Sequence, residues 1–238
     1  MSANIVASSL AVGYGHRPII SGVEFTLEPG ALMVLIGTNG SGKSTLLKTL
    51  AGLLTAQSGS VQVLGAEPGT LPARVAYLPQ HPVSSHSLPL RVHDIVAMGR
   101  FAHRGLLRRT TAHDTSIVID VMKRTGADEY SARALRDLSG GQQQRTHLAQ
   151  VLARQAEVLL LDEPTAGLDI NGRQAVADLI SQERSRGVTV VMATHELGDA
   201  EGADIVMLLA QRVVAQGTPA HALSDAALRE CFGFTQPH

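Results

Sequence analysis

The sequence predicts an α/β fold with a mainly parallel sheet, an antiparallel β element near the N-terminus and a helical insert. Three observations predict it. Short apolar runs alternate with helical patterns, a glycine-rich loop joins one such run to a helix, and strand patterns stop between residues 91 and 154. The 238 residues are 44% apolar but only 3% aromatic, so we expect a single domain with a mainly aliphatic core.

Apolar runs bounded by turn residues predict the strands. In the first third of the chain these runs cover residues 4–12, 23–27, 32–36, 61–64 and 74–78. Turn residues separate the first two runs, so we expect an antiparallel element there. A helix over 43–51 should bury Leu46, Leu47 and Leu50, and the prolines within 79–90 make that segment a connector.

Between 91 and 154 the apolar periodicity is helical. The expected helices cover 92–98, 114–123 with Ile117, Val118, Val121 and Met122 on one face, and a segment with Leu148, Val151 and Leu152. We therefore expect one domain, 1–238, that divides into an α/β core (1–85 and 155–238) and a helical subdomain (86–154).

Strand patterns return after residue 154, at 158–161 and 188–193. Between them Asn171 is expected to cap a helix that uses Val176, Leu179 and Ile180 as its inner face. Thr218 and Pro219 are typical of a helix start, so the C-terminal helices should begin there.

Charge and composition weigh against several classes of function. The chain has 20 basic and 21 acidic residues, a net charge of −1, so we expect no nucleic-acid partner. The single cysteine, Cys231, cannot form an intrachain disulfide. We expect no signal peptide and no spanning segment, because the longest apolar runs fall far short of the roughly 20 residues that a spanning helix needs.

A phosphate-binding loop is predicted between the strand at 32–36 and the helix at 43–51. Its residues match the P-loop pattern, and Thr45 follows them: Gly37, Thr38, Asn39, Gly40, Ser41, Gly42, Lys43 and Ser44. The glycines let backbone N–H groups converge on phosphate oxygens, and the helix N-terminus adds a favourable dipole. Lys43 is expected to place its positive charge on the β- and γ-phosphates of the ligand, and the Ser44 hydroxyl is expected to bind Mg²⁺. The alternative is a chance glycine turn before a helix.

Two acidic residues end the strand at 158–161. Asp162 would lie beside the Mg²⁺ ion, and Glu163 would act as the general base that polarises the attacking water. The alternative is a pair of carboxylates that simply ends a strand in solvent.

The segment Leu138-Ser139-Gly140-Gly141-Gln142-Gln143-Gln144-Arg145 decides among the classes of P-loop protein. It closely resembles the signature motif of ABC ATPases. The order of motifs also resembles an ABC nucleotide-binding domain over essentially the whole chain: the P-loop, Gln80, the signature, Asp162 with Glu163, Asp169 and His195.

This resemblance implies a role for each motif residue. In the family the signature of one protomer faces the P-loop of the other, so Ser139, Gly140, Gly141 and Gln142 would complete the ATP site of a partner copy. Asp169 would join the two sites, and His195 would contact the γ-phosphate and orient Glu163 or the water. Gln80 would lie near Mg²⁺ and the water, and Tyr14 would stack on adenine. The alternatives are structural: Tyr14 packing on the strand pair, Gln80 as a loop residue, His195 as a satisfied histidine and Asp169 as a helix-entry residue.

The resemblance extends to a group of importers. Residues 88–100 and the segment after His195 are similar to ATPases of manganese, zinc and iron-chelate importers. It implies a homodimer of ATPase subunits at the cytoplasmic face of the membrane, bound to a separate permease and served indirectly by an extracytoplasmic substrate-binding protein. Zinc or manganese is the expected cargo, and a ferric siderophore or haem is the alternative. A non-transport ABC ATPase and a P-loop binding module without turnover are further alternatives.

Two clusters of charged or titratable residues remain. The histidines are His81, His86, His93, His103 and His113. They would either sense metal or be solvated or capping residues, and their spacing fits no standard ligand motif. The arginines are Arg100, Arg104, Arg108 and Arg109. They would either meet the permease or anionic lipid headgroups, or form a solvated face.

Overall fold

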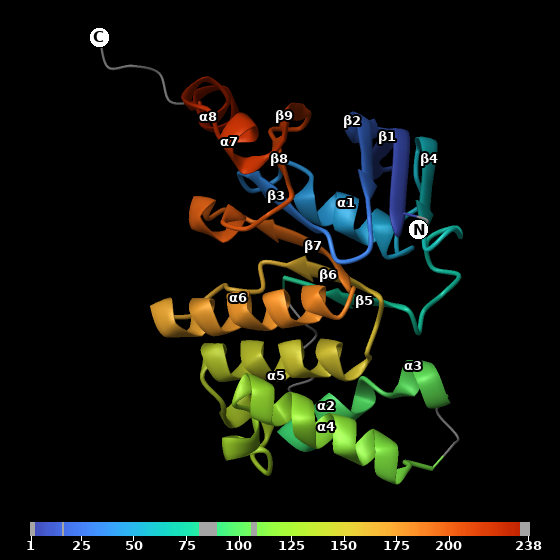
Figure 1. Ribbon diagram of the computed structural model, residues 1–238, viewed down its shortest axis with the longest axis vertical. Helices are drawn as coiled ribbons and strands as arrows, with labels where there is room; N and C mark the ends of the chain where they lie inside the picture. Colours follow the sequence, from blue (N-terminus) through green and yellow to red (C-terminus); the bar gives the residue numbers. More distant parts are fainter. Residues whose placement is uncertain (1–2, 16, 81–89, 106–108, 234–238) are drawn as a thin grey trace.

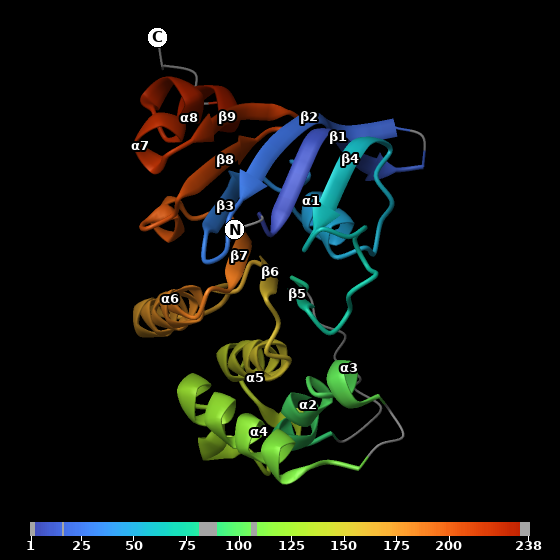
Figure 2. The ribbon, with the colours of Figure 1, turned by 45° about the vertical axis from the view of Figure 1, so that its right-hand side comes forward.

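The described residues form two β-sheets, with helices on both faces of the larger sheet. The computed structural model describes residues 3–15, 17–80, 90–105 and 109–233 (Figure 1). An antiparallel three-stranded sheet has the order β2-β1-β4. Its strands are β1 (Ile5–Tyr14), β2 (Arg17–Leu27) and β4 (Ser58–Val63). Figure 2 shows this sheet beside helix α1 (Lys43–Leu50), apart from the helices at the opposite end of the molecule.

The second sheet is the six-stranded core, in the order β5-β6-β7-β3-β8-β9. Its strands are β3 (Leu32–Gly37), β5 (Val75–Leu78), β6 (Val158–Asp162), β7 (Thr189–Thr194), β8 (Ile205–Leu209) and β9 (Val213–Gly217). All neighbours pair in parallel except β8 with β9. The predicted α/β fold with an antiparallel N-terminal element is therefore confirmed, whereas the sequence patterns did not predict the strands β8 and β9.

The six-stranded sheet separates two apolar cores. Successive side chains of a strand point to opposite faces, so the continuous apolar run of β3 serves both. Val34 and Ile36 pack on the side of the helices between residues 92 and 153, which we call the helical layer. Met33 and Leu35 pack with α1 and the antiparallel sheet. This division explains why β3 is buried at every position.

Two helices cover opposite faces of this sheet. Helix α1 (Lys43–Leu50) lies against the three-stranded sheet and buries the expected Leu46, Leu47 and Leu50. Helix α6 (Ile170–Ser185) lies on the other face. Its cap differs from the prediction: Asp169, not Asn171, accepts a hydrogen bond from the backbone N–H of Gly172 at 2.9 Å.

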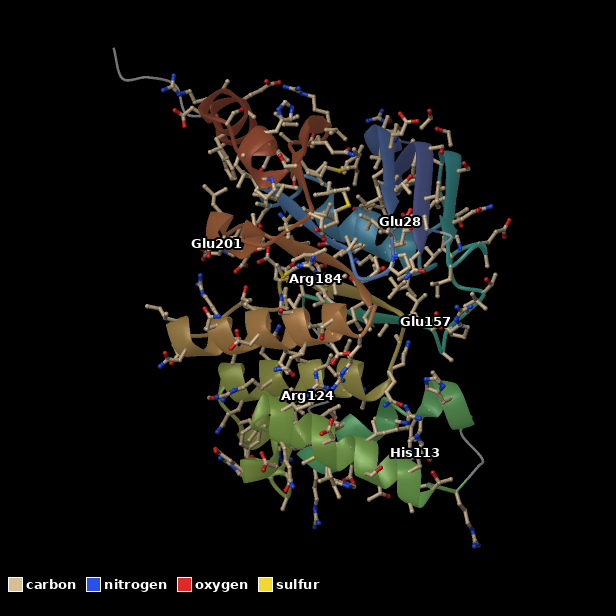
Figure 3. All side chains as sticks on the ribbon, in the orientation of Figure 1. Glu28, His113, Arg124, Glu157, Arg184 and Glu201 are labelled. Carbon is tan, nitrogen blue, oxygen red and sulfur yellow. The ribbon has the colours of Figure 1, made fainter. Side chains whose placement is uncertain are left out.

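Helices follow one another along the next part of the chain, and the described residues from 92 to 153 contain no named strand. The helices are α2 (Val92–Met98), α3 (Phe101–Arg104), α4 (Ala112–Thr125) and α5 (Gly140–Ala153), with short 3-10 turns at Asp128–Tyr130 and Leu135–Asp137. Both α2 and α4 pack on α5. The apolar face predicted for α4 is buried. Arg124, labelled in Figure 3, joins α4 to α6 through an ion pair with Glu183.

The C-terminal segment packs on the outer strands of the sheet. Helix α7 (Pro219–Ala222) begins directly after Thr218, as expected, and α8 (Asp225–Phe232) follows it. Both helices contact β8 and β9. Within the described part of the chain, no helix combines the length and the apolar character needed to cross a bilayer.

Arg100, the first residue of the predicted arginine cluster, is buried and does not belong to an exposed basic surface. The Arg100 side chain is 7% exposed, and its Nε donates to Asp114 Oδ1 at 2.9 Å. Its Nη1 also donates to the carbonyl of Ala153, so it ties three helices together and cannot serve as a surface charge. Arg109 is exposed, whereas Arg108 lies outside the described residues.

The described histidines of the predicted cluster do not form a metal site. His93, His103 and His113 are exposed, and the described ranges contain no group of three or more His, Cys, Asp or Glu side chains that could hold a metal ion. His81 and His86 lie outside those ranges.

Candidate active site

Three loops meet at one edge of the six-stranded sheet. They follow β3, β6 and β7, which are neighbours and run parallel, so their carboxyl ends lie together. Binding sites of open α/β sheets lie at this edge. The topology therefore brings the glycine loop, Asp162 with Glu163, and His195 to one place.

The glycine loop is shaped by close backbone contacts. A Cβ atom on Gly37 would lie 2.1 Å from the carbonyl oxygen of Leu209, and Gly42 has a φ of +107°, so glycine is required at both positions. Lys43 is almost fully buried, and its Nζ donates to the carbonyls of Gly37 at 2.6 Å and Thr38 at 3.1 Å. The lysine charge is thus held against the loop that would surround a phosphate.

Two buried oxygens at this site have no hydrogen-bond partner among the described residues. They are Ser41 Oγ in the loop and Asp162 Oδ1 at the end of β6. An unpaired buried polar atom costs about 1–3 kcal/mol, so such atoms point to a ligand. The pKa of Asp162 is raised by burial, although a hydrogen bond from Ser44 and the charge of Lys43 partly oppose this shift. The Asp162 carboxylate and the Ser44 hydroxyl that is hydrogen-bonded to it are oxygen ligands of the kind that suits a hard cation such as Mg²⁺.

Charges within the site act on Lys43 as well. Burial lowers its pKa, and the carboxylates of Glu163 and Asp162 oppose that effect. A buried ammonium group that lacks full compensation has much to gain from a phosphate anion. The site is therefore suited electrostatically to bind a polyphosphate together with a cation.

Glu163 and His195 form a hydrogen-bonded pair. The distance between His195 Nδ1 and Glu163 Oε2 is 2.8 Å. The Glu163 side chain is 4% exposed, whereas that of His195 is 56% exposed, so the histidine lies on the open side of the pair. Glu163 has a φ of +54°, an unusual value for a residue with a side chain. Such a pair can accept a proton and orient a water molecule.

The backbone around Glu163 is held from two sides. Its N–H donates to the carbonyl of Ala193 on β7 at 2.9 Å. Gln144 on α5 is buried, and its Nε2 donates to the carbonyls of Glu163 at 3.2 Å and Pro164 at 3.0 Å. Gln144 belongs to the signature segment, but the motif alone gave no sign that its side chain reaches this loop.

The signature segment caps α5 and does not share a face with the glycine loop. Ser139 and Gln142 form a reciprocal capping box, with Gln142 N–H on Ser139 Oγ and Ser139 N–H on Gln142 Oε1. The following residues, Gly140 and Gly141, begin the helix. Helix α5 lies in the helical layer beyond the six-stranded sheet, whereas α1 lies on the other face (Figure 1). Within one chain these two motifs are therefore separate.

The remaining predicted residues lie around the edge of the site. Tyr14 is half exposed, and its hydroxyl accepts a hydrogen bond at 3.4 Å from Lys48 on α1. Gln80 is exposed just after β5, and Asp169 caps α6 with its side chain. Thr45 is buried in the first turn of α1, while Thr38, Asn39 and Gly40 are exposed in the loop.

Comparison with known proteins identifies similar sequences and structures. The model of the ABC transporter family matches residues 20–166. A manganese transport system ATP-binding protein of Halalkalibacterium halodurans is 35% identical, with 91% of this chain and 87% of the relative covered. A zinc transport system ATP-binding protein of Treponema pallidum is 34% identical over 96% of this chain and 86% of the relative.

The similar proteins also include one named for iron transport and several with solved structures. A chelated iron transport system membrane protein of Yersinia pestis is 35% identical, covering 98% of this chain and 80% of the relative. The structure of cbiO1 from Clostridium perfringens, part of the ABC transporter complex cbiONQ, has a TM-score of 0.80 and 25% identity. That alignment covers 97% of this chain and 94% of the solved chain.

Proposed function

Since this chain belongs to the ABC transporter family and is an ATP-binding, ATP-hydrolysing member of it, we propose that it energises the import of zinc or manganese through a separate membrane permease. The observation that carries the catalytic part is the pairing of Glu163 with His195 beside the glycine loop. The names of the relatives support the cargo.

Each residue of the site has its own part in the proposed hydrolysis. Backbone N–H groups of residues 37–45 and the ammonium group of Lys43 bind the phosphates. Glu163 accepts the proton of the attacking water, and His195 orients that carboxylate and contacts the γ-phosphate. Ser44, Asp162 and Gln80 would hold Mg²⁺, whose charge would screen the phosphate oxygens. Tyr14, which is exposed and contacts Lys48 of α1, stacks on adenine.

A second copy of the chain completes each site. In the proposed homodimer, Ser139, Gly140, Gly141 and Gln142 of one protomer meet the ATP held by the other, and Asp169 lies between the two sites. The separation of the signature from the glycine loop within one chain supports this arrangement. ATP then joins the protomers, and its hydrolysis lets them part, which is a two-state change biased by a ligand.

The helical region is the proposed route to the membrane partner. We divide the chain into a core, 1–85 and 155–238, and a helical subdomain, 86–154, a division that the mutual packing of α2, α4 and α5 supports. In this proposal the ATPase works at the cytoplasmic face of the membrane. Its permease receives cargo from an extracytoplasmic substrate-binding protein, and no nucleic acid takes part.

Iron-chelate uptake, as a ferric siderophore or haem, is the second candidate. The relative from Yersinia pestis, named for chelated iron transport, supports it at an identity equal to that of the manganese relative. Metal-uptake measurements with manganese, zinc and a ferric chelate, in cells that carry and lack this chain together with its permease, separate these cargoes.

A Glu163→Gln variant tests the proposed chemistry. The amide keeps the size of the side chain but cannot accept a proton, so turnover should fall about 10²–10⁴-fold while ATP binding persists. Phosphate release and binding of a fluorescent ATP analogue measure the two properties. Normal phosphate release by Glu163→Gln contradicts the assignment of the base.

A further inference from the structure

One carboxylate connects the two loops that carry Glu163 and His195. Asp199 Oδ2 accepts hydrogen bonds from the hydroxyl of Thr194 at 2.7 Å and from the hydroxyl of Thr165 at 3.0 Å. Asp199 lies in the short 3-10 turn Leu197–Ala200, which follows the loop after β7. None of the motifs described above includes Asp199.

The two threonines lie next to the reacting pair. Thr194 is the last residue of β7 and directly precedes His195, and Thr165 lies two residues beyond Glu163. Both threonine side chains are buried, at 0% and 5% exposure. Their hydroxyl protons therefore need acceptors inside the protein, and Asp199 accepts both.

Asp199 and its hydrogen bonds to Thr165 and Thr194, which we call the clamp, act on a backbone that is under strain. Glu163 adopts a φ of +54°, and such a conformation costs about 1–3 kcal/mol unless its surroundings hold it. Ala193 and Gln144 hold the loop through the backbone of Glu163 and Pro164. Asp199 is the contact that couples this loop, through a side chain, to the residue before His195. Charged acceptors make shorter and stronger hydrogen bonds than neutral ones.

We propose that Asp199 is a positioning residue for ATP hydrolysis, which sets the distance and angle between the Glu163 carboxylate and the His195 ring by fixing Thr165 and Thr194. It acts through these residues and touches no substrate. This inference rests on the proposed role of Glu163 and His195 in hydrolysis. It explains why an acidic side chain lies between two loops that meet at the reacting pair.

The first test separates positioning from binding. Asp199→Ala should lower kcat about tenfold, which corresponds to about 1.4 kcal/mol, and leave the KM for ATP within about twofold. Thr194→Val keeps the shape of its side chain but removes the hydroxyl, so it should reproduce that loss. Asp199→Asn keeps an oxygen that can accept both protons and should restore most of kcat.

A matched control comes from the same turn of chain. Glu201, labelled in Figure 3, is an exposed carboxylate two residues from Asp199. Glu201→Ala removes one negative charge nearby without touching either threonine, so its kcat should equal that of the unaltered protein. If Glu201→Ala lowered kcat as much as Asp199→Ala, the effect would be one of charge, and the clamp would be refuted.

A double variant tests whether Asp199 acts through Glu163. In a Glu163→Gln background the base is absent, so adding Asp199→Ala should change the residual turnover less than about twofold. A further tenfold loss in that background would refute the clamp, and so would a normal kcat in Asp199→Ala. Normal turnover of Glu163→Gln alone would instead overturn the proposed base, so the two failures are distinguishable.

Discussion

The burial of Asp162 conflicts with the magnesium-binding role that we propose for it. Its side chain is 2% exposed, one of its oxygens has no partner in the described part of the chain, and burial raises its pKa. A raised pKa means that folding favours the protonated acid. Stability from this group is therefore greatest below its ordinary pKa and is lost as the pH rises through the raised value.

We expect Asp162→Asn to stabilise the nucleotide-free protein at neutral pH while it abolishes magnesium-dependent ATP hydrolysis. The amide carries no charge to bury, so the melting temperature should rise by about 2–4 °C for each kcal/mol gained. The difference between the two proteins should shrink as the pH falls toward the acid range. Thermal melting without nucleotide, from neutral pH downward, measures this. If Asp162→Asn had a lower melting temperature than the unaltered protein at neutral pH, the prediction would be wrong, because the Asp162 carboxylate would then stabilise the fold.

At the scale of elements, one buried ion pair joins the helical layer to the core. Arg124 on α4 pairs with Glu183 on α6, and their side chains are 15% and 11% exposed. Glu183 also meets Arg186 at 3.1 Å. Two charges at such burial stabilise a fold only as a pair, because each one alone would be buried without compensation.

Arg124→Met should therefore lower the free energy of unfolding by about 3–5 kcal/mol, because it leaves Glu183 buried with only the more exposed Arg186. The double variant Arg124→Met/Glu183→Leu replaces both charges with apolar groups and should recover most of that loss. Urea unfolding of the three proteins measures it. If the double variant were as unstable as the single one, the loss would come from packing and not from the unpaired charge.

The elements also show what sequence patterns can and cannot predict. The glycine loop, Asp162 and Glu163 are local motifs at the ends of strands, and the structure has those strands where apolar runs predicted them.

The burial of Arg100 was not predicted, because its partner Asp114 is reached only when α4 folds back. Asp199 was missed for the same reason: its bond to Thr165 exists only because β6 and β7 are neighbours. At the start of α6, Asp169 and Asn171 are both capping types, and only the backbone geometry selects Asp169.

At the scale of the whole molecule, the proposal requires two copies for one complete site. Ser139→Arg places a bulky cation at the capping box of α5, where the partner's nucleotide would lie. ATP binding to the monomer should persist, while the ATP-dependent dimer of a Glu163→Gln protein should disappear when Ser139→Arg is added. Size-exclusion chromatography with saturating ATP and Mg²⁺ measures the dimer. Persistence of the dimer in the double variant would contradict the composite site.

The pairing register of β6 and β7 determines whether the proposed catalytic pair can form. His195 and Glu163 come from β7 and β6, whose pairing sets Asp162 opposite Ala193. A slip of one residue along β7 would turn every side chain to the other face and carry the imidazole away from its carboxylate. Because β7 contributes side chains to both apolar cores, a molecule with that mispairing would lose the packing of both cores and the proposed catalytic pair in the same event. Misfolded copies of this motor should therefore be inert, and they would not consume ATP wastefully.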